Sequence, residues 1–585
     1  MNMRKMFFVW SIAVSFGISC MTSIKRDDRN LASSGQSSTT VTALKLAYVR
    51  SPDALVAEQI RTRIETAGVV TELRAGGEPV YESVALPSFY ERRLYLPAWS
   101  DRRGPTRLVD DLVSALRQAD LEGGVRPEDY HLAPIETLLT AIRTDVRSVG
   151  VIVPDRWAEL DLLLTDAFLV YGSHLLSGRV NPETLKPEWV ANRRGADFAA
   201  VLEAALKSGD VVAGALVKLA PPQRGFRRLR EALAYHRSVA ARGGWPIIPD
   251  GPNLKRGDHD PSVAALRERL RLGGDLDTAV VADSELLDET LEQTLKRFQW
   301  RHGLTATGIL DASTRAELNV SAETRVKQLE LNLERWRWLP QDLGRRHIIV
   351  NIAAFELKVE EDEEVALAMR VVVGRPYHST PVFSDTMRYL VLNPYWNVPR
   401  DIAVQEVLPH LQRDSTYLTK QGMRVFKGWG PEAQELDPST LDWATVDTVH
   451  FPFRLRQDPG PINALGRIKF MFLNKFSVYL HDTPARPLFE RTRRDFSHGC
   501  IRIQQPIELA EYLLRKNSHW NRKKLLAELD EAEDRSLPLP EPIPIHLLYW
   551  TAWADMDGTI QFRRDIYDRD APLLAALQSP PPSKK

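Results

Sequence analysis

Two residues that together can perform thiol acyl transfer lie close to each other in this sequence. The chain contains two cysteines, Cys20 and Cys500, and Cys500 belongs to the stretch Ser497–Arg502 (SHGCIR). His481 lies nineteen residues before Cys500, in the stretch YLHD. The thiolate is the nucleophilic form of cysteine, and an imidazole can take the thiol proton and later return it to a leaving amine. The pair therefore predicts a cysteine nucleophile with His481 as proton acceptor and donor.

Alternating strand patterns decide which side chains can meet at this site. His481 ends an alternating segment, so Tyr479 and His481 are expected on one face of a strand. The segment that starts at Cys500 places Cys500 and Arg502 on one face by the same rule. If the two strands are neighbours in a sheet, His481 and Cys500 can meet.

The groups around Cys500 suit the stabilisation of developing charge. Gly499 allows a substrate to approach the backbone closely, and the N–H groups of Gly499 and Cys500 can form an oxyanion hole. Arg502 presents a guanidinium fork that matches a carboxylate. His498 is a second imidazole beside the cysteine, but the two side chains share a face only if the segment is extended, so His498 as the base stays an alternative.

Bulk composition limits the function classes. A chain of 585 residues is expected to form three or four domains, and 43% hydrophobic with 26% charged residues is ordinary for a soluble globular protein. Lys+Arg and Asp+Glu are both 77, which gives a formal net charge of zero. No basic surplus is present, so nucleic-acid binding is not expected.

The N-terminus has the pattern of a targeting segment. Residues 1–19 start with Arg4 and Lys5, continue with an apolar run too short for a membrane span, and end in small residues. Cleavage after Ser19 makes Cys20 the first mature residue, which resembles a bacterial lipoprotein signal and predicts export with a lipid anchor at Cys20. An ordinary secretion signal with an incidental cysteine stays as the alternative.

The periodicity of apolar residues divides the rest of the chain. Helical spacing dominates the first half of the mature chain, and from Arg345 apolar residues alternate with polar ones as in strands. The predicted parts are a tether and N-terminal segment (20–85), an all-α domain (86–250), a compact three-helix unit (255–320), a β domain (325–525), and a C-terminal hairpin with a tail (526–585).

Residues 402–453 interrupt the β pattern with helical and irregular sequence. Excursions of this length inside a β domain are usually functional or mobile, so we predict a lid over the site. A lid that excludes water favours transfer to another acceptor over hydrolysis.

Two stretches of sequence resemble known families. Residues 298–311 (FQWRHGLTATGILD) resemble the signature of small three-helix peptidoglycan-binding modules, with a generic helical hairpin as the alternative. YLHD followed by SHGCIR resembles the L,D-transpeptidase (YkuD-type) catalytic domain. The order of parts resembles the large exported branch of that family in Gram-negative bacteria.

The resemblance implies a fold class and a location. The fold class is multidomain α+β: a mainly β catalytic domain (a YkuD-type β-sandwich) with an inserted helical lid (402–453), an all-α scaffold, and a three-helix peptidoglycan-binding module. The implied location is the periplasm, and the implied partner is peptidoglycan.

The resemblance also implies a chemistry. Cys500 attacks the carbonyl between meso-diaminopimelate and the terminal D-alanine of a tetrapeptide stem, D-alanine leaves, and a thioester forms. A second diaminopimelate amine then attacks to give a 3→3 cross-link. His481 is the base and acid in this scheme; the residues that shape the substrate and oxyanion site are Ser497, His498, Gly499, Arg502 and Tyr479. The family implies no metal and no cofactor, and it implies carbapenems as inhibitors that acylate Cys500.

Other functions remain open on sequence alone. Water as acceptor makes the enzyme an L,D-carboxypeptidase or endopeptidase, and a lysine of an envelope lipoprotein can replace the second stem. A wall-binding protein with an inactive catalytic domain is another alternative. A zinc hydrolase using His378, His481, His498 and Cys500 is a third, although no His-x-x-x-His spacing supports it.

Overall fold

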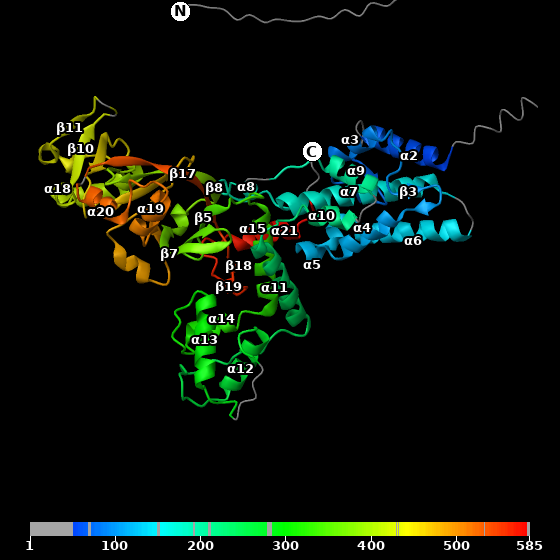
Figure 1. Ribbon diagram of the computed structural model, residues 1–585, viewed down its shortest axis with the longest axis horizontal. Helices are drawn as coiled ribbons and strands as arrows, with labels where there is room; N and C mark the ends of the chain where they lie inside the picture. The colour runs from blue at the N-terminus through cyan, green and yellow to red at the C-terminus, as the bar shows by residue number, and fades with distance from the viewer. Residues whose placement is uncertain are drawn as a thin grey trace, which may run out of the picture. The chain divides into compact units, whose positions relative to one another are not determined.

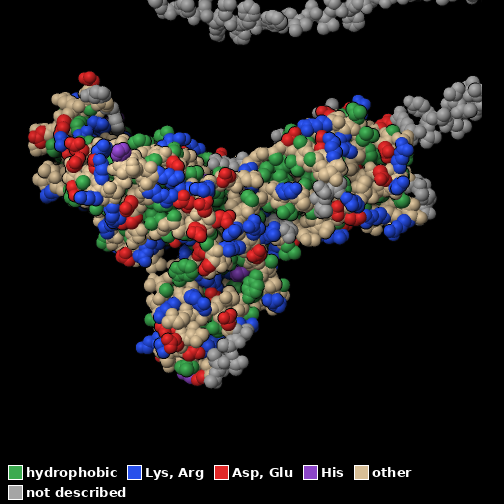
Figure 2. Space-filling view, in the orientation of Figure 1, with side chains coloured by type: hydrophobic (Ala, Val, Ile, Leu, Met, Phe, Trp, Pro, Cys, Tyr) green, Lys and Arg blue, Asp and Glu red, His purple; other side chains and the backbone are tan. Residues whose placement is uncertain are grey.

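The computed structural model describes residues 51–67, 72–148, 152–190, 194–208, 212–277, 283–428, 430, 432–531 and 533–581. The predicted signal segment, Cys20 and its lipid anchor, and the Ser/Thr-rich tether lie outside the described residues. Within the described ranges, no helix is both long enough and apolar enough to cross a membrane. On the face drawn in Figure 2, basic and acidic side chains are interspersed, as the zero net charge leads one to expect.

The first half of the chain is helical, as predicted. Its central helix, α7 (Pro154–Ser177), starts with proline in the first turn and ends at Gly178, whose φ of +81° favours glycine. Nearly every side chain of α7 from Trp157 onward is buried, because other helices surround it. These neighbours and the remaining helices of the region are α2 (Pro52–Ala67), α3 (Ala85–Arg92), α4 (Arg107–Arg117), α5 (Ala119–Gly123), α6 (Leu132–Ser148), α8 (Pro182–Leu185), α9 (Phe198–Ser208), α10 (Val212–Val217) and α11 (Arg224–Ala241) (Figure 1).

Three helices follow in the segment that resembles a wall-binding module. They are α12 (Ser262–Leu272), α13 (Glu289–Arg301) and α14 (Ala312–Leu318). Asp311 caps α14 by accepting a hydrogen bond from the Thr314 backbone N–H, which satisfies one of the free donors of the first turn. The three helices share one small apolar core. A long helix, α15 (Ala322–Arg337), then packs against α11 and leads into the β domain.

The β domain contains a nine-stranded sheet with the order β15-β7-β16-β14-β13-β8-β17-β5-β6. β6 also pairs with β7, so the sheet closes on itself, which the predicted sandwich did not anticipate. Its strands are β5 (Arg346–Asn351), β6 (Glu356–Glu361), β7 (Glu364–Gly374), β8 (Phe383–Leu392), β13 (Ile468–Phe472), β14 (Leu480–His481), β15 (Asp495–Ser497), β16 (Ile501–Ile503) and β17 (Arg535–Leu548).

Alternation along these strands sends one set of side chains into a common core. Met369, Val371 and Val373 of β7 belong to that core, and so do Ile501 and Ile503 of β16. The helices α19 (Pro506–Leu514) and α20 (Arg522–Asp530) contribute leucines to the same core. The polar residues between the core positions therefore face away from it, and the site lies on this outer face.

One strand of the sheet comes from beyond residue 525, where the sequence placed the domain boundary. β17 lies between β8 and β5, antiparallel to the first and parallel to the second (Figure 1). The predicted C-terminal hairpin follows as β18 (Ala552–Ala554) and β19 (Ile560–Phe562), and α21 (Asp570–Gln578) ends the described chain. The C-terminal region is thus part of the β domain.

The insert (residues 402–453) is only partly the helical lid that was predicted. Its first part is helical: it follows α16 (Arg400–Ile402) with a π-helical turn (Ala403–Val407), α17 (Leu408–Leu411) and α18 (Tyr417–Lys420). Its second part forms β10 (Met423–Lys427) and β11 (Gln434–Leu436), which join β12 (Phe453–Gln457) and β9 (Trp396–Asn397) in a small sheet. Helices and sheet enclose an apolar core of their own, so the insert is a folded unit.

Buried histidines predict acid sensitivity of the fold. Burial lowers the pKa of His236 and of His546 to about 4, and it lowers the pKa of His302 well below the ordinary value. The unfolded chain binds protons near pH 6.5 while these folded histidines do not, so stability falls as pH falls below about 6.5. We expect the free energy of unfolding to fall by up to about 2 kcal/mol per histidine at pH 5.

The midpoints of urea unfolding at pH 7.5, 6 and 5 measure this loss of stability. His546→Gln should flatten the dependence and exposed His450→Gln should not; equal midpoints at all three pH values would contradict the prediction.

Candidate active site

Strand pairing brings His481 and Cys500 to the same face of the sheet. β14 and β16 run parallel, with Leu480 opposite Ile501 and His481 opposite Arg502. The Ile501 backbone N–H donates to the Tyr479 carbonyl at 3.1 Å, which extends the pairing back to Cys500. Leu480 and Ile501 point into the core, so their neighbours in sequence point outward together. The predicted clustering of Tyr479, His481, Cys500 and Arg502 is therefore the arrangement in the structure.

A tight turn from Ser497 to Cys500 presents the thiol. The Ser497 hydroxyl donates to the Cys500 carbonyl at 2.5 Å and accepts from the Gly499 backbone N–H at 3.1 Å. Gly499 has φ of +107°, where a side chain would be strained. The predicted oxyanion hole needs correction, because the Gly499 N–H is already engaged by Ser497. The Cys500 N–H is the backbone donor that remains of the two predicted.

A second set of hydrogen bonds, made by residues outside the turn, also holds it in place. The Thr380 hydroxyl donates to the Gly499 carbonyl at 2.9 Å and accepts from the Gly374 backbone N–H at 2.9 Å. The Tyr567 hydroxyl, from the C-terminal region, donates to the Gly374 carbonyl at 2.5 Å. A Cβ at Gly374 would lie 2.0 Å from the His378 carbonyl oxygen and 3.0 Å from the Gly499 Cα. Thr380, Tyr567 and Gly374 thus hold the turn from Ser497 to Cys500 in place, and sequence reasoning missed all three.

The tautomer and protonation state of His481 leave one ring nitrogen able to accept a proton. Its Nδ1 lies 2.5 Å from the Asp482 carbonyl oxygen, and since a carbonyl only accepts, Nδ1 carries the proton. Nε2 then holds the lone pair. Burial and, to a smaller extent, the neighbouring Arg502 cation together lower the pKa of His481 to about 3. The imidazole is therefore neutral at physiological pH and free to accept a proton.

The Cys500 thiol is half-buried and mainly protonated. Burial raises the pKa of Cys500, while hydrogen bonds from Tyr479 and the cations Lys469 and Arg502 oppose that rise. Sγ also lies 4.0 Å from the Ser477 carbonyl oxygen. Among the described residues, no hydrogen bond joins Sγ to the imidazole. A protonated thiol needs a base, which is the role the neutral His481 can fill.

Lys469 is a site residue that sequence reasoning missed. It lies on β13 directly opposite His481, and its Nζ is 3.9 Å from the centre of the Tyr479 ring. Burial lowers the pKa of Lys469, and a thiolate at Cys500 raises it. A lysine inside the apolar stretch IKFMF was a signal, but the register that places it beside His481 cannot be read from the sequence.

Replacing Lys469 with methionine is expected to slow alkylation of Cys500 by iodoacetamide at pH 8 about three- to tenfold. Loss of the cation raises the pKa of the Cys500 thiol, and only thiolate reacts. Lys475→Met is the matched control, because Lys475 is exposed on the loop between β13 and β14 and its Nζ contacts Phe476. Equal alkylation rates in the two variants would contradict a role for Lys469 at the thiol.

Arg502 has a side-chain donor that no protein group satisfies in the described part of the chain. Its Nε is buried and has no hydrogen-bond partner in the described part of the chain. Burial lowers the pKa of Arg502, and the charge of a Cys500 thiolate opposes this. A buried donor of this kind is costly unless a ligand pairs with it. The carboxylate contact of Arg502 stays a prediction.

His498 turns toward the insert. Its Nε2 lies 2.7 Å from Oε1 of Glu406, which belongs to the π-helical turn of the insert. Arg375 lies 3.8 Å from the same carboxylate oxygen, and the His378 ring centre is 5.3 Å from that of His498. His498 therefore joins the insert to the nucleophile turn, and its geometry does not favour the alternative in which it is the base. Among the described residues, no group of three or more ligating side chains could hold a metal ion.

Comparisons with known proteins agree with the order of parts. A model of the YkuD family, described as "L,D-transpeptidase catalytic domain", matches residues 345–522. Models described as "Putative peptidoglycan binding domain" and "Scaffold domain" match residues 259–318 and 84–233. A "Putative L,D-transpeptidase" of Haemophilus influenzae is 34% identical over 257 residues, which is 44% of this chain and 51% of that protein. The chain thus spans about half the length of the curated relative it matches.

Solved structures give weaker likenesses. An L,D-transpeptidase from Mycobacterium smegmatis is 15% identical over 35% of this chain and 58% of its own, with a TM-score of 0.16. The crystal structure of an L,D-transpeptidase from Xylanimonas cellulosilytica is 13% identical over 51% of this chain and 98% of its own, with a TM-score of 0.16. Scores this low carry no argument about the fold.

Proposed function

The chain carries an L,D-transpeptidase catalytic domain of the YkuD family together with a peptidoglycan-binding domain and a scaffold domain, and from this we propose that it cross-links peptidoglycan through a Cys500 thioester. One observation carries the proposal. Cys500, neutral His481 and the unpaired Nε of Arg502 share one sheet face beside the insert.

In the first half-reaction His481 Nε2 takes the thiol proton, and Sγ attacks the carbonyl carbon between diaminopimelate and D-alanine. The Cys500 N–H faces the developing oxyanion, which pre-organised donors stabilise by a few kcal/mol. The C–N bond then breaks, and the imidazolium returns the proton to the leaving D-alanine amine. A thioester links the stem to Cys500.

In the second half-reaction the side-chain amine of another diaminopimelate attacks the thioester. His481 takes the amine proton, the C–S bond breaks, and the thiolate recovers a proton as the 3→3 cross-link forms. Water in place of the amine gives hydrolysis. The contact between Glu406 and His498 supports transfer, because it holds the insert at the nucleophile turn where it can limit access of water.

The proposal includes location and inhibition. Residues 1–19 have the pattern of an export signal, which supports activity in the periplasm, and Cys20 supports a lipid anchor. Carbapenems are proposed to acylate Cys500, because their strained amide is attacked by the thiol in the same way as the stem. Labelling of Cys500 by a carbapenem, measured as a mass increase of the protein, tests this part.

Product analysis tests the function. The mature chain without Cys20 (residues 21–585) is incubated with disaccharide tetrapeptides, and the products are separated and weighed. Dimers lighter than two monomers by one D-alanine are the expected result. Tripeptide monomers without dimers would show that the protein is a carboxypeptidase and not a transpeptidase. An unchanged substrate together with unmodified Cys500 would favour a wall-binding protein without catalytic activity.

A further inference from the structure

Arg375 comes directly after β7, beside the turn that carries Cys500. Its backbone N–H donates to the Ser497 carbonyl at 2.9 Å, and the pairing of β7 with β15 places Gly374 opposite Ser497. Gly374 packs so closely on this turn that a Cβ there would lie 3.0 Å from the Gly499 Cα. The backbone at Arg375 is therefore fixed relative to the residues that present the thiol.

The side chain of Arg375 lies at the junction between this turn and the insert. Its Nη1 donates to the Tyr377 hydroxyl at 3.0 Å and lies 3.8 Å from Oε1 of Glu406 on the insert. The same carboxylate oxygen lies 2.7 Å from Nε2 of His498, which belongs to the turn. The Arg375 side chain is 38% exposed, so a ligand from solution can contact it.

The guanidinium of Arg375 has more donors than the protein uses. An arginine side chain carries several N–H donors in a planar fork, and among the described residues this one makes a single hydrogen bond, to Tyr377. The contact with Glu406 is longer than a hydrogen bond, whereas Arg224 lies 3.0 Å from its partner Glu363. Arg375 can therefore bind a further carboxylate through its fork.

The charges near this junction also favour a bound anion. Burial lowers the pKa of Arg502, and so does the charge of Arg375, whereas a Cys500 thiolate and the Glu406 carboxylate raise it. Arg375 and Arg502 are thus near enough to repel each other, and Arg502 in turn lies near the thiol. A carboxylate bound at Arg375 reduces this repulsion.

We propose that Arg375 binds the carboxylate of the terminal D-alanine in the stem that Cys500 attacks. The inference rests on the proposed function and names a residue that selects its substrate. This carboxylate is attached to the carbon that follows the scissile nitrogen, so the residue that recognises it must lie beside the turn that carries the nucleophile. Arg375 meets this condition and is exposed, whereas the unpaired Nε of Arg502 is buried.

Kinetics with an amidated stem test the assignment. The mature chain without Cys20 (residues 21–585) is assayed for release of the terminal residue from the tetrapeptide stem and from the same stem with the D-alanine carboxylate converted to a carboxamide. The carboxylate keeps its charge throughout the reaction, so its contact lowers KM and leaves kcat nearly unchanged. For the wild type, amidation is expected to raise the KM about tenfold, the effect of one hydrogen-bonded contact to a charged group.

Variants of Arg375 separate this contact from other effects of amidation. Arg375→Gln should have the raised KM with both stems, so that amidation no longer changes it. Arg375→Lys keeps the charge without the fork, and its KM for the tetrapeptide should lie between those of wild type and Arg375→Gln. Amidation also changes the leaving amine, but it does so alike in every variant, so the ratio of the two KM values reports on the contact.

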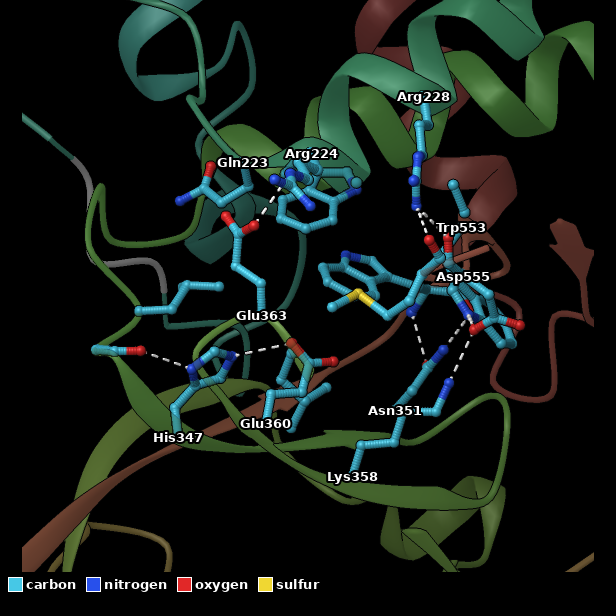
Figure 3. Close-up of a pocket in the computed structure, with 18 of the residues that line it drawn as sticks. Gln223, Arg224, Arg228, His347, Asn351, Lys358, Glu360, Glu363, Trp553 and Asp555 are labelled. Carbon is cyan, nitrogen blue, oxygen red and sulfur yellow. Dashed lines mark hydrogen bonds and ion pairs between the residues drawn. The ribbon is translucent and has the colours of Figure 1, made fainter. Parts of the chain in front are cut away.

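Arg224→Gln is the matched control. Arg224 is likewise an exposed arginine beside a carboxylate, with a side chain that is 60% exposed and an Nε 3.0 Å from Glu363. It lines a cavity of about 570 Å³ that none of the residues of the Cys500 site borders (Figure 3). Arg224→Gln should keep the wild-type KM and the wild-type ratio between the two stems.

The outcomes separate this inference from the proposed function. Equal KM values of the wild type for the two stems would overturn the inference, and so would an effect seen only when the diaminopimelate carboxylate is amidated instead. A wild-type ratio retained in Arg375→Gln would overturn it as well, because Arg375 would then act only through Glu406 of the insert. The absence of product from the unmodified stem with wild-type protein would instead count against the proposed function.

Discussion

Cys500→Ala is expected to lower the rate of cross-linked product formation by at least about 10⁴-fold, because no other described group on the sheet face can form the acyl intermediate. The remaining groups position or stabilise: Arg502 carries the unpaired donor, and Lys469 and Tyr479 contact each other beside the thiol. These groups can bind the stem but cannot replace the covalent step. Rates are measured from dimer formation under conditions where wild-type turnover is linear.

A control must show that the loss of activity does not come from misfolding of the variant. Cys500→Ser keeps the size of the side chain and replaces thiol with hydroxyl, so it should fold like the wild type and lose activity to nearly the same extent. The mature chain without Cys20 contains one cysteine, so one titratable thiol in the wild type and none in either variant shows that each substitution removed the Cys500 thiol. Dimers formed by Cys500→Ala at the wild-type rate would exclude Cys500 as the nucleophile.

His481→Ala is expected to lower kcat/KM about 10²- to 10⁴-fold, which is the usual contribution of a general base. The structural reason is that the Asp482 carbonyl holds the Nδ1 proton and leaves Nε2 as acceptor. His498→Ala is the matched control, since His498 contacts Glu406 of the insert. We expect a far smaller loss in His498→Ala, and a loss equal to that of His481→Ala would reverse the assignment of the base.

The pH profile provides a second readout for the same residue. Burial lowers the pKa of His481 to about 3 and raises that of Cys500, so between pH 5 and pH 8 the imidazole is neutral and the thiol is protonated. Neither group changes its charge in this window, and kcat/KM of the wild type should be flat across it. A fall in kcat/KM toward acid pH with a midpoint near pH 6.5 would contradict this prediction, because it would show that folding leaves the pKa of His481 at its ordinary value. His481→Ala should lose the plateau and gain rate with pH as thiolate forms.

Local sequence predicted the helical first half of the chain, most strands of the β domain, and the shared strand faces of the proposed catalytic residues. Alternation along YLH and CIRI is a property of each strand, and it placed Tyr479 with His481 and Cys500 with Arg502 before any pairing was known. Apolar spacing at helical period likewise predicted the helical first half of the chain, because that pattern is set by which face of each helix is buried. The division into a helical first half and a β domain followed from the period of the apolar residues, and the identity of the parts followed from the resemblance to known families.

Pairing between distant segments was not predictable in the same way. β17 joins the sheet from beyond residue 525, and nothing within residues 535–548 says that its neighbours are β8 and β5. The insert shows the same limit: the sequence of its short strands β10 and β11 has no clear strand pattern, and their hydrogen bonds come from pairing, β11 with β10 and β10 with β12. Strand register and sheet closure depend on contacts between residues far apart in the chain.

Residue type and strand period are local properties, so the sequence alone predicted Cys500 as nucleophile, His481 as base, and the strand face on which each lies. The other contacts of the site follow from the tertiary structure. Pairing of β13 with β14 brought Lys469 beside His481, and the turn at Ser497 engaged the Gly499 N–H. Folding of the insert gave His498 a carboxylate partner in Glu406. These contacts depend on where separate segments meet, and that is fixed by the packing of the whole core.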